Sequence, residues 1–584
     1  MGAPMRRFAP TLGPPPCLPP ELSTSPFAMG TWRKIRRLTC SCKESETPMT
    51  PKKSPEWDSE TDVIVVGLGG AGACAAIEAS QNSSQVTVLE RFTGGGATAI
   101  SGGVIYAGGG TDIQKEAGVE DDIDSMHAYL TLETEGVVSP ELILDFCRTS
   151  SENIRWLTSL GLRFGSSLCP YKTSYPNDNY YLYYSGNETI EPYKTAARPA
   201  PRGHRVKGKG LPGKNFFEPL RDQLRAQGVD VRLHSRVKEL VLDEAGSVSG
   251  LVYHEIPTGL WSILHGKIEK TASKFALLLP PVARFFRRLG NQIEGRHANP
   301  KRIRARKGVI LSTGGFINNR SMMSEFAPRY LKGLPIGTTG CSGEGMEMAQ
   351  AVGGHLKYMT NISGWMFINP PHAFIHGMLV NREGRRFMNE TLYGAVVGGK
   401  IMEECQGEAF LIIDQKLKSL GRSQIGRKQT QSFQTIPSLL NLRFNCKKAM
   451  SIEELAHICH CEADALAKSL RTYNDGAESG QPDEFKKEER ATLQPPYYVI
   501  KCSDQQWTSP LMTLTLGGLS VDEENGKVLR EDKSPIKGLY SAGRTAVGLC
   551  SKNYVSGLSI ADCVYSGRRA GRAASNQPVD STND

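Results

Sequence analysis

The sequence predicts an α/β fold in which one domain is split by an inserted α+β domain. Three observations support this architecture. Between Asp62 and Glu90, an apolar β-branched run turns through glycines into a small-residue helix and a second strand. From about His355 to about Met512 the pattern changes to mixed helices and short strands. At Gly538 a strand with a glycine turn returns, so we expect the C-terminal segment to complete the first domain.

These changes of pattern also set the expected domain boundaries. We expect five segments: a disordered, basic, Pro-rich leader at 1–58, the first part of the split domain at 59–354, the inserted domain at 355–512, the second part at 513–576 and a disordered tail at 577–584. Acidic residues are few before Glu44, so a transit peptide is an alternative interpretation of the leader.

The first glycine turn has the spacing of a nucleotide site. Val63 to Val66 predicts a buried parallel strand, and Gly67, Gly69 and Gly72 follow it at G-x-G-x-x-G spacing. Such glycines permit a tight turn, let a pyrophosphate approach the backbone, and let the helix pack closely on the strand. The free N–H groups of the helix N-terminus favour the phosphates. Glu90, at the end of the next strand, is placed to bind a ribose hydroxyl, so we expect a Rossmann-like dinucleotide site.

Two further stretches suit a flat, largely apolar ligand. The loop from Gly94 to Gly110 is dense in glycine, which lets backbone lie against a ligand and donate N–H groups to it. Buriable residues within it favour a structured loop over a flexible linker. The segment SYPNDNYYLYYSGNE holds five tyrosines, and tyrosine offers a pocket a flat face and one polar handle. They are Tyr175, Tyr180, Tyr181, Tyr183 and Tyr184.

A basic amphipathic insertion is expected at 257–306, within the first part of the split domain. From Lys267 to Lys307 there are twelve Lys or Arg against two Glu, an excess equal to the net charge of +10 of the whole chain. The segment also carries Trp261 and Phe285 among other apolar residues, and it is too short and too charged to span a bilayer. A peripheral contact with an anionic membrane surface and a solvated helical insertion both remain open. No reader motif suggests nucleic acid.

The cysteines indicate a reducing, intracellular location, either cytoplasmic or peripheral on a membrane. The 14 cysteines are scattered without a disulfide-type pattern. A group of His and Cys residues between His457 and Cys461 lacks the ligand spacing of a zinc site, so no metal is expected.

Five segments in order resemble the flavoprotein family of fumarate reductase and 3-ketosteroid dehydrogenases: GLGGAG with Glu90, ATAISGG, STGGF, GLYSAGR and GLSIADCVYSGRRAG. The resemblance implies a Rossmann-like FAD-binding domain split by a cap domain, with substrate held between the cap and the isoalloxazine. It implies FAD contacts at Gly67, Gly69, Gly70, Ala71, Gly72, Glu90, Ala97, Thr98, Ser101, Gly102, Gly103, Val237, Thr313, Gly314, Gly543, Ser559 and Ile560.

Within this family the chain departs from the fumarate reductases. Those members carry an Arg after the Asn near the last glycine turn and a His-Pro-Thr segment in the cap. Here Tyr554 follows Asn553, and the comparable cap segment reads GWMFINPPHA. The groups that would hold two carboxylates are therefore missing, although a fumarate-reductase-like enoate or dicarboxylate reductase stays the alternative. A flavin-binding membrane-surface protein without turnover is a third hypothesis.

The ketosteroid dehydrogenase pattern implies catalytic roles for Tyr554, Tyr393 and Ser556, and substrate contacts at Tyr183 and Tyr184. In such enzymes a proton leaves the carbon beside a 3-ketone and a hydride leaves the next carbon for flavin N5. Tyrosine is a poor base with a pKa of about 10, so donors must polarise the ketone. Which tyrosine acts as base is left open. The position of the double bond, 1,2 or 4,5, is also left open, although the motifs favour 4,5. The choice between a sterol and a triterpenoid 3-ketone as substrate and the identity of the electron acceptor are left open too.

Overall fold

The structure is a computed structural model, and it describes residues 56–275, 279–426 and 429–578. The predicted disordered leader and tail lie outside these ranges except for residues 56–58 and 577–578. The described residues belong to one compact unit, Glu56–Asp584.

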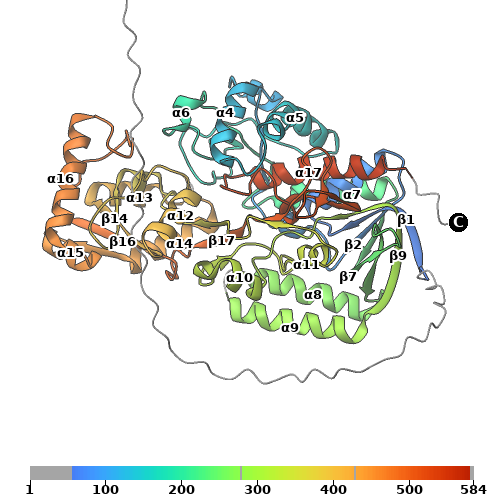
Figure 1. The fold of residues 1–584 in the computed structure, drawn as a ribbon. Helices are drawn as coiled ribbons and strands as arrows, with labels where there is room; N and C mark the ends of the chain where they lie inside the picture. Colours follow the sequence, from blue (N-terminus) through green and yellow to red (C-terminus); the bar gives the residue numbers. More distant parts are fainter. Residues whose placement is uncertain (1–55, 276–278, 427–428, 579–584) are drawn as a thin grey trace, which may run out of the picture. The chain divides into compact units, whose positions relative to one another are not determined.

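The first domain is built on an eight-stranded sheet, whose longest path runs β19-β20-β9-β1-β2-β6. Its strands are β1 (Ser59–Val66), β2 (Val86–Glu90), β6 (Asp230–Leu233), β7 (Ser235–Leu242), β8 (Val248–Glu255), β9 (Asn299–Leu311), β19 (Lys527–Leu529) and β20 (Pro535–Ser541). Strand β1 pairs in parallel with β2 and β9, and β20 pairs in parallel with β9. Both ends of the folded chain thus build one sheet, and the predicted α/β fold with a split domain is confirmed (Figure 1).

Two helices pack tightly beside this sheet because their contact faces consist of small residues. Helix α1 (Gly70–Gln81) follows β1, and α17 (Leu558–Ser575) ends the described chain. A Cβ added at Gly567 would lie 2.5 Å from the carbonyl oxygen of Ala71, and one at Gly571 would lie 2.4 Å from that of Ala75. Only glycine permits this approach, so the C-terminal helix is held directly against the helix of the first glycine turn.

The segment between these parts carries an antiparallel sheet in the order β13-β14-β16-β15. Its strands are β13 (Met378–Val380), β14 (Glu408–Asp414), β15 (Cys446–Ala449) and β16 (Tyr497–Ser503). Strand β12 (Ile362–Trp365) pairs with β17 (Met512–Thr515), so the two borders of the predicted inserted domain, 355–512, lie side by side. Short strands complete this junction: β10 (Leu334–Pro335), β11 (Leu356–Lys357) and β18 (Gly518–Leu519).

The remaining helices lie around the two sheets (Figure 1). In the first domain they are α2 (Gly96–Ala99), α3 (Asp112–Glu116), α4 (Ile123–Thr134), α5 (Pro140–Ser159), α6 (Tyr193–Ala196), α7 (Gly213–Ala226), α8 (Leu260–Phe275), α9 (Pro280–His297), α10 (Arg320–Phe326) and α11 (Glu344–Ala351). In the inserted segment they are α12 (Gly394–Glu404), α13 (Gln415–Gln424), α14 (Ser432–Phe444), α15 (Ile452–Cys459) and α16 (Ala463–Ser479). A small sheet joins β3 (Val104–Tyr106), β5 (Gly203–Arg205) and β4 (Leu182–Tyr183).

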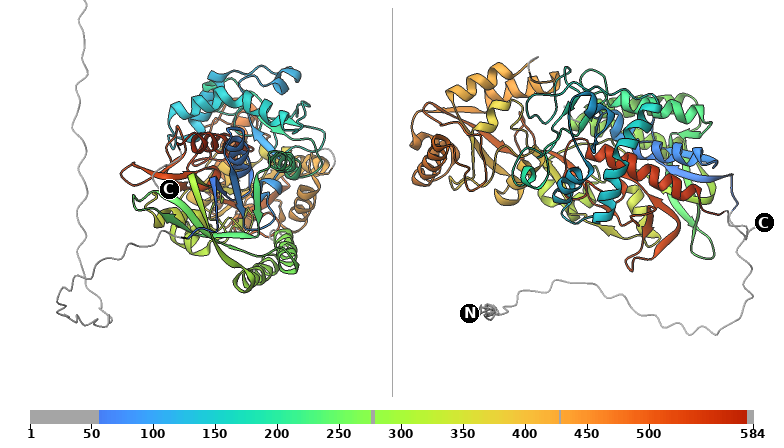
Figure 2. Two further views of the ribbon diagram at one scale, coloured as in Figure 1. Left: turned by 90° about the vertical axis from the view of Figure 1, so that its right-hand side faces the viewer. Right: turned by 90° about the horizontal axis from the view of Figure 1, so that it is seen from above.

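The basic insertion consists of the paired helices α8 and α9, which lie side by side at the margin of the sheet (Figures 1 and 2). It leaves the sheet after β8 and re-enters it at β9, where Glu255 pairs with Asn299. The insertion was expected to reach residue 306, but residues 299–306 lie in strand β9. The alternation of buried Ile303 and Ala305 with arginines explains this difference, because such alternation is typical of a strand. None of the helices in the described ranges has the length and apolar content needed to cross a membrane.

Candidate active site

The first glycine turn forms where β1 passes into α1. Gly67 has a φ of +97°, which favours glycine, and a Cβ there would lie 2.7 Å from the carbonyl oxygen of Ser312. At Gly72 a Cβ would lie 1.9 Å from the carbonyl oxygen of Gly67, so no other residue fits. At Gly69, by contrast, a Cβ would meet no atom within 4 Å. The turn is closed on its helix side and open on the side of Gly69.

Glu90 is buried at the end of β2 and holds the same turn. Its two carboxylate oxygens accept hydrogen bonds from the backbone N–H groups of Leu68 at 2.7 Å and Phe92 at 2.8 Å. Burial raises the pKa of Glu90, and these two hydrogen bonds oppose that rise. Each oxygen keeps a second lone pair, so the carboxylate retains capacity for a ribose hydroxyl.

The glycine-dense loop is ordered by hydrogen bonds from the predicted cofactor residues. Thr98, in α2 beside Ala97, accepts from the N–H of Gly70 at 3.1 Å. Ser101 donates to the carbonyl of Thr98 at 2.8 Å and accepts from the N–H of Gly103 at 3.1 Å. A Cβ at Gly102 would lie 2.4 Å from the ring of Tyr175, so the loop packs against the tyrosine segment.

Other predicted cofactor residues lie on neighbouring strand ends and on the start of α17. The N–H of Gly314 donates to Thr545 at 2.9 Å, and the hydroxyl of Thr313 lies 3.4 Å from that of Thr545. The N–H of Gly543 donates to Ser566 at 2.9 Å. Ser559 and Ile560 occupy the first turn of α17, whereas Val237 is buried in β7 opposite Tyr253.

These surroundings fit a large anionic ligand. Apart from the Gly70 N–H, which Thr98 accepts, neither α1 nor α17 has a side-chain cap at its N-terminus among the described residues, although each helix begins with a buried residue. Uncapped N-termini leave N–H donors for phosphate or carbonyl oxygens. Arg544, in the glycine turn after β20, is buried, and its Nη1 atom has no hydrogen-bond partner among the described residues. A buried guanidinium with an unpaired N–H group is costly unless a ligand accepts it.

The predicted catalytic residues come together where the inserted segment meets the first domain. Tyr183, in β4, and Ser556, just before α17, have hydroxyl oxygens 2.7 Å apart and are both buried. Burial raises the pKa of Tyr393 well above its ordinary value, the phenols of Tyr554 and Tyr183 raise it further, and a hydrogen bond with Ser556 opposes these effects. We call Tyr183, Tyr393, Tyr554 and Ser556 the hydroxyl cluster.

Tyr554 lies at the partly exposed edge of the hydroxyl cluster. Its ring is 4.6 Å from that of Trp365 in β12, measured between centroids. Burial raises its pKa, the Cys550 thiol adds to the rise, and the guanidinium of Arg544 opposes it. A neutral phenol beside a fixed cation can donate a hydrogen bond to a ligand oxygen.

Asn187, in the first domain, is hydrogen-bonded to the backbone of Tyr393 in the hydroxyl cluster. Its Oδ1 accepts from the backbone N–H of Tyr393 at 2.8 Å, and its Nδ2 donates to Glu133 at 2.9 Å. Tyr129 donates to the same Glu133 oxygen at 2.7 Å. Tyr393 directly precedes α12, so this buried chain joins α4 of the first domain to the first helix of the inserted segment.

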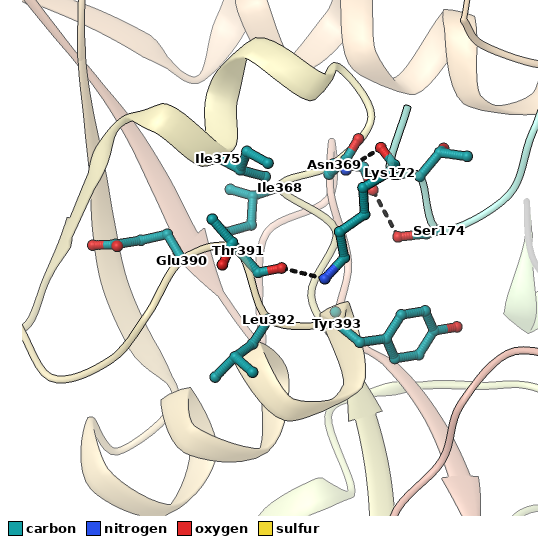
Figure 3. Close-up of a pocket in the computed structure, with 11 residues that line it drawn as sticks. Lys172, Ser174, Ile368, Asn369, Ile375, Glu390, Thr391, Leu392 and Tyr393 are labelled. Atoms are coloured by element: carbon teal, nitrogen blue, oxygen red, sulfur yellow. Dashed lines mark hydrogen bonds between the residues drawn. The ribbon is translucent and has the colours of Figure 1, made fainter. Parts of the chain in front are cut away.

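A small cavity of about 10 Å³ lies on the other side of Tyr393, about the volume that one water molecule needs. Figure 3 shows Lys172 reaching across it, with its Nζ donating to the carbonyl of Thr391 at 2.5 Å. The ring of Tyr393 points away from this bond. Burial lowers the pKa of Lys172, with the carboxylates of Glu188 and Glu133 opposing the decrease.

Two differences separate the predicted site from the observed one. Tyr184 is half-buried, and the groups that act on its pKa are Glu188, Arg202 and Asp121 rather than members of the hydroxyl cluster. Asn187, Arg544 and Trp365 were not predicted, although Arg544 lies inside the motif GLYSAGR that pointed to the site. Within the described ranges, no three His, Cys, Asp or Glu side chains are arranged to hold a metal ion.

Comparison with known proteins identifies the class to which this fold and site belong. Residues 62–559 match the family described as FAD binding domain. The match covers most of the chain, so the chain belongs to this FAD-binding family, and its cofactor is FAD. The protein is therefore a flavoprotein oxidoreductase, as the five resembling segments predicted.

The chain is similar both to a steroid dehydrogenase and, at lower identity, to a fumarate reductase. A 3-oxo-5-alpha-steroid 4-dehydrogenase from Comamonas testosteroni is 36% identical over 508 residues, which cover 84% of this chain and 93% of that protein. A fumarate reductase (cytochrome) from Shewanella frigidimarina is 24% identical over 525 residues, covering 88% of this chain and 76% of that protein.

A solved structure shows the same fold. It is the 3-ketosteroid-delta4-(5alpha)-dehydrogenase from Rhodococcus jostii RHA1 in complex with 4-androstene-3,17-dione. The two chains are 30% identical, with a TM-score of 0.77, and the similarity covers 90% of this chain and 99% of that one. The predicted membership in the fumarate reductase and 3-ketosteroid dehydrogenase group is confirmed.

Proposed function

We propose that this chain is an FAD-dependent dehydrogenase of 3-oxosteroids or related 3-ketones, and that it introduces the double bond between C4 and C5. The observation that carries the proposal is the hydroxyl cluster at the junction of the two domains. Three phenols and one serine lie together there, so the cluster holds neutral hydroxyls for both a carbonyl oxygen and a proton. A dicarboxylate would instead need several cations. Among the described residues, two arginines act on the pKa of a cluster member, Arg544 on that of Tyr554 and Arg205 on that of Tyr183. Arg205 is already paired with Asp178 at 2.7 Å, which leaves Arg544 as the cation available to a ligand.

The chemistry removes a proton from C4 and a hydride from C5. The glycine turn of Gly67, Gly69 and Gly72 would hold FAD, which would supply the two-electron acceptor for this hydride. Tyr554 is suited to donate to the C3 ketone oxygen, because it lies at the partly exposed edge of the cluster beside Arg544. Such a donor stabilises the enolate-like charge that develops as the C4 proton leaves, and each preorganised donor typically contributes a few kcal/mol.

The proton from C4 is taken up within the pair of hydroxyls of Tyr393 and Ser556. A tyrosine with a raised pKa is a weak base unless it passes its own proton on as it accepts another. The hydroxyl of Ser556 lies 2.7 Å from that of Tyr183 and also lowers the pKa of Tyr393, so these neighbouring hydroxyls provide such a path. We assign Ser556 and Tyr393 to this transfer and Tyr183 to the positioning of Ser556. From these hydroxyls the proton passes to solvent water.

The assignment of the double bond to C4 and C5 rests on similarity. The relative that acts as a 3-oxo-5-alpha-steroid 4-dehydrogenase is 36% identical, whereas a 3-oxosteroid 1-dehydrogenase from Mycobacterium tuberculosis is 26% identical. Both chemistries use the same ketone, so product analysis decides between them. The 36% identity also leaves room for a bulkier sterol or triterpenoid ketone at the same cluster.

Anaerobic titration of the purified holoenzyme tests the proposal. A 5α-saturated 3-oxosteroid should bleach the yellow flavin, and chromatography should find the 4-ene-3-ketone. A 1-ene product would refute the position of the double bond. If the steroid leaves the flavin oxidised, while fumarate reoxidises chemically reduced enzyme, the steroid assignment fails as a whole.

A pair of tyrosine variants separates the proposed donor from a merely packed phenol. Tyr554→Phe should lower kcat by about 100-fold or more, since removal of one preorganised donor has that effect. Tyr540 is also buried, and its hydroxyl has no hydrogen-bond partner among the described residues. Tyr540→Phe should therefore keep the activity of the unaltered enzyme.

A further inference from the structure

The helices α8 and α9 present an outward surface that is basic and apolar. Six cationic side chains on it are exposed: Lys267, Lys270, Lys274, Arg284, Arg288 and Arg296. In the part of the chain that the structure describes, none of the six forms an ion pair. Large apolar side chains stand among them, with Leu260 73% exposed, Ile263 58% and Phe285 63%. Their spacing of three or four residues places them on the solvent side of each helix.

We call α8 and α9 together the helical hairpin. Its two acidic residues point toward the first domain. Glu294 forms ion pairs with Arg91 at 2.8 Å and Arg236 at 2.9 Å, both in the first domain. Glu269 accepts hydrogen bonds from Thr339 at 2.6 Å and Ser273 at 2.9 Å. Glu294 and Glu269 thus hold the hairpin against the first domain. The outer surface of the hairpin carries positive charge alone.

We propose that this outer surface of α8 and α9 docks the enzyme on the surface of an anionic lipid bilayer. Clusters of Lys and Arg on an amphipathic helix are attracted to anionic headgroups, and each such residue near the surface contributes about fivefold in affinity. Exposed Leu, Ile and Phe side chains add to the binding free energy when they leave water and enter the boundary between headgroups and acyl chains. Figure 2 shows the hairpin at the outer margin of the folded unit, where a flat surface can reach it.

A lipid surface suits these residues better than an acidic protein or a nucleic acid. Those partners would be recognised by the cations, but the exposed aliphatic and aromatic side chains would remain in water or need matching pockets. At a bilayer both kinds of side chain find their preferred surroundings at once. The proposal is independent of the reaction, because no hairpin residue belongs to the hydroxyl cluster or the glycine turns.

Sedimentation of the full-length holoenzyme with vesicles tests the proposal. We expect binding to phosphatidylcholine vesicles with about 30% phosphatidylserine, weakened by added salt, and little binding to pure phosphatidylcholine. The triple variant Lys267→Gln, Lys270→Gln, Lys274→Gln should bind about 100-fold more weakly. Steroid-dependent flavin bleaching should be unchanged in it.

A matched control has the same change of net charge elsewhere. Lys447, Lys448 and Lys468 are exposed and belong to the inserted segment. Their replacement by Gln should leave vesicle binding within about twofold of the unaltered protein, since they do not face the bilayer. Equal losses in the two triple variants would overturn the proposal, as would failure of the unaltered holoenzyme to bind anionic vesicles.

Fluorescence gives an independent test of which surface contacts lipid. Trp261, at the start of α8, is 41% exposed. Brominated lipids in the vesicles should quench part of the tryptophan emission of the bound enzyme, and Trp261→Phe should remove that part. Quenching that persists undiminished in Trp261→Phe would show that another surface meets the membrane, and it would overturn the assignment to the hairpin.

Discussion

Replacing Asn187 by Ala tests whether the buried chain from α4 to α12 positions Tyr393. The change removes the acceptor of the Tyr393 N–H at 2.8 Å and a donor to Glu133 at 2.9 Å. Each buried group left without its partner costs about 1–3 kcal/mol, so the free energy of unfolding should fall by about 2–6 kcal/mol. Movement of Tyr393 by about 1 Å would also lower kcat by about 100-fold.

Urea unfolding and steady-state kinetics measure these two effects separately. Asn153→Ala serves as the matched control, because Asn153 is buried and accepts a 2.7 Å hydrogen bond from Arg568 far from the hydroxyl cluster. It should lose stability while the folded fraction keeps its kcat. If Asn187→Ala loses stability but turns over as fast as the control, Asn187 has no positioning role and the reasoning is refuted.

Three further predictions concern the cofactor turn, the pH dependence of stability and the proton path. Gly69→Ala should fold normally, because its Cβ meets no protein atom within 4 Å, but it should bind FAD more weakly in fluorescence titration. Gly72→Ala should yield misfolded protein, because its Cβ would lie 1.9 Å from a carbonyl oxygen. Burial raises the pKa of Glu133 from 4.5 to about 7. Because the protonated form is favoured in the folded state, stability should be lost as pH rises from about 4.5 to 7, by about 3 kcal/mol, and Glu133→Gln should abolish this loss in urea unfolding at pH 5 and 8. Ser556→Ala should lower kcat by about 100-fold or more at unchanged flavin content, and a kcat near that of the unaltered enzyme would remove Ser556 from the proton path.

The sequence predicted the parts of the site that local spacing determines. Gly67, Gly69 and Gly72 could be placed from one short motif, because a strand, a tight turn and a helix impose that spacing. Tyr393 and Ser556 were proposed from resemblance, and the structure brings them together across the domain junction. Their chemical roles stay predictions for the variants above.

Contacts between distant segments could not be predicted in the same way. The bond between Asn187 and Tyr393 joins residues 206 positions apart, and no local pattern marks such a pair. Likewise, the charge of the segment 257–306 was visible, but the inward direction of Glu294 toward Arg91 and Arg236 was not. Strand alternation at Ile303 and Ala305 was hidden by the surrounding arginines, so the insertion was expected to extend too far.

The point where the helical hairpin leaves the sheet allows its removal by design. Residues 256–298 depart and return between Glu255 and Asn299, which already face each other as neighbours. A two-residue turn would close that point without shifting the register of any strand. Removal of the hairpin would therefore leave the order of the strands unchanged. Arg91 and Arg236 would lose Glu294 but keep Glu344, which pairs with them at 3.0 and 2.8 Å.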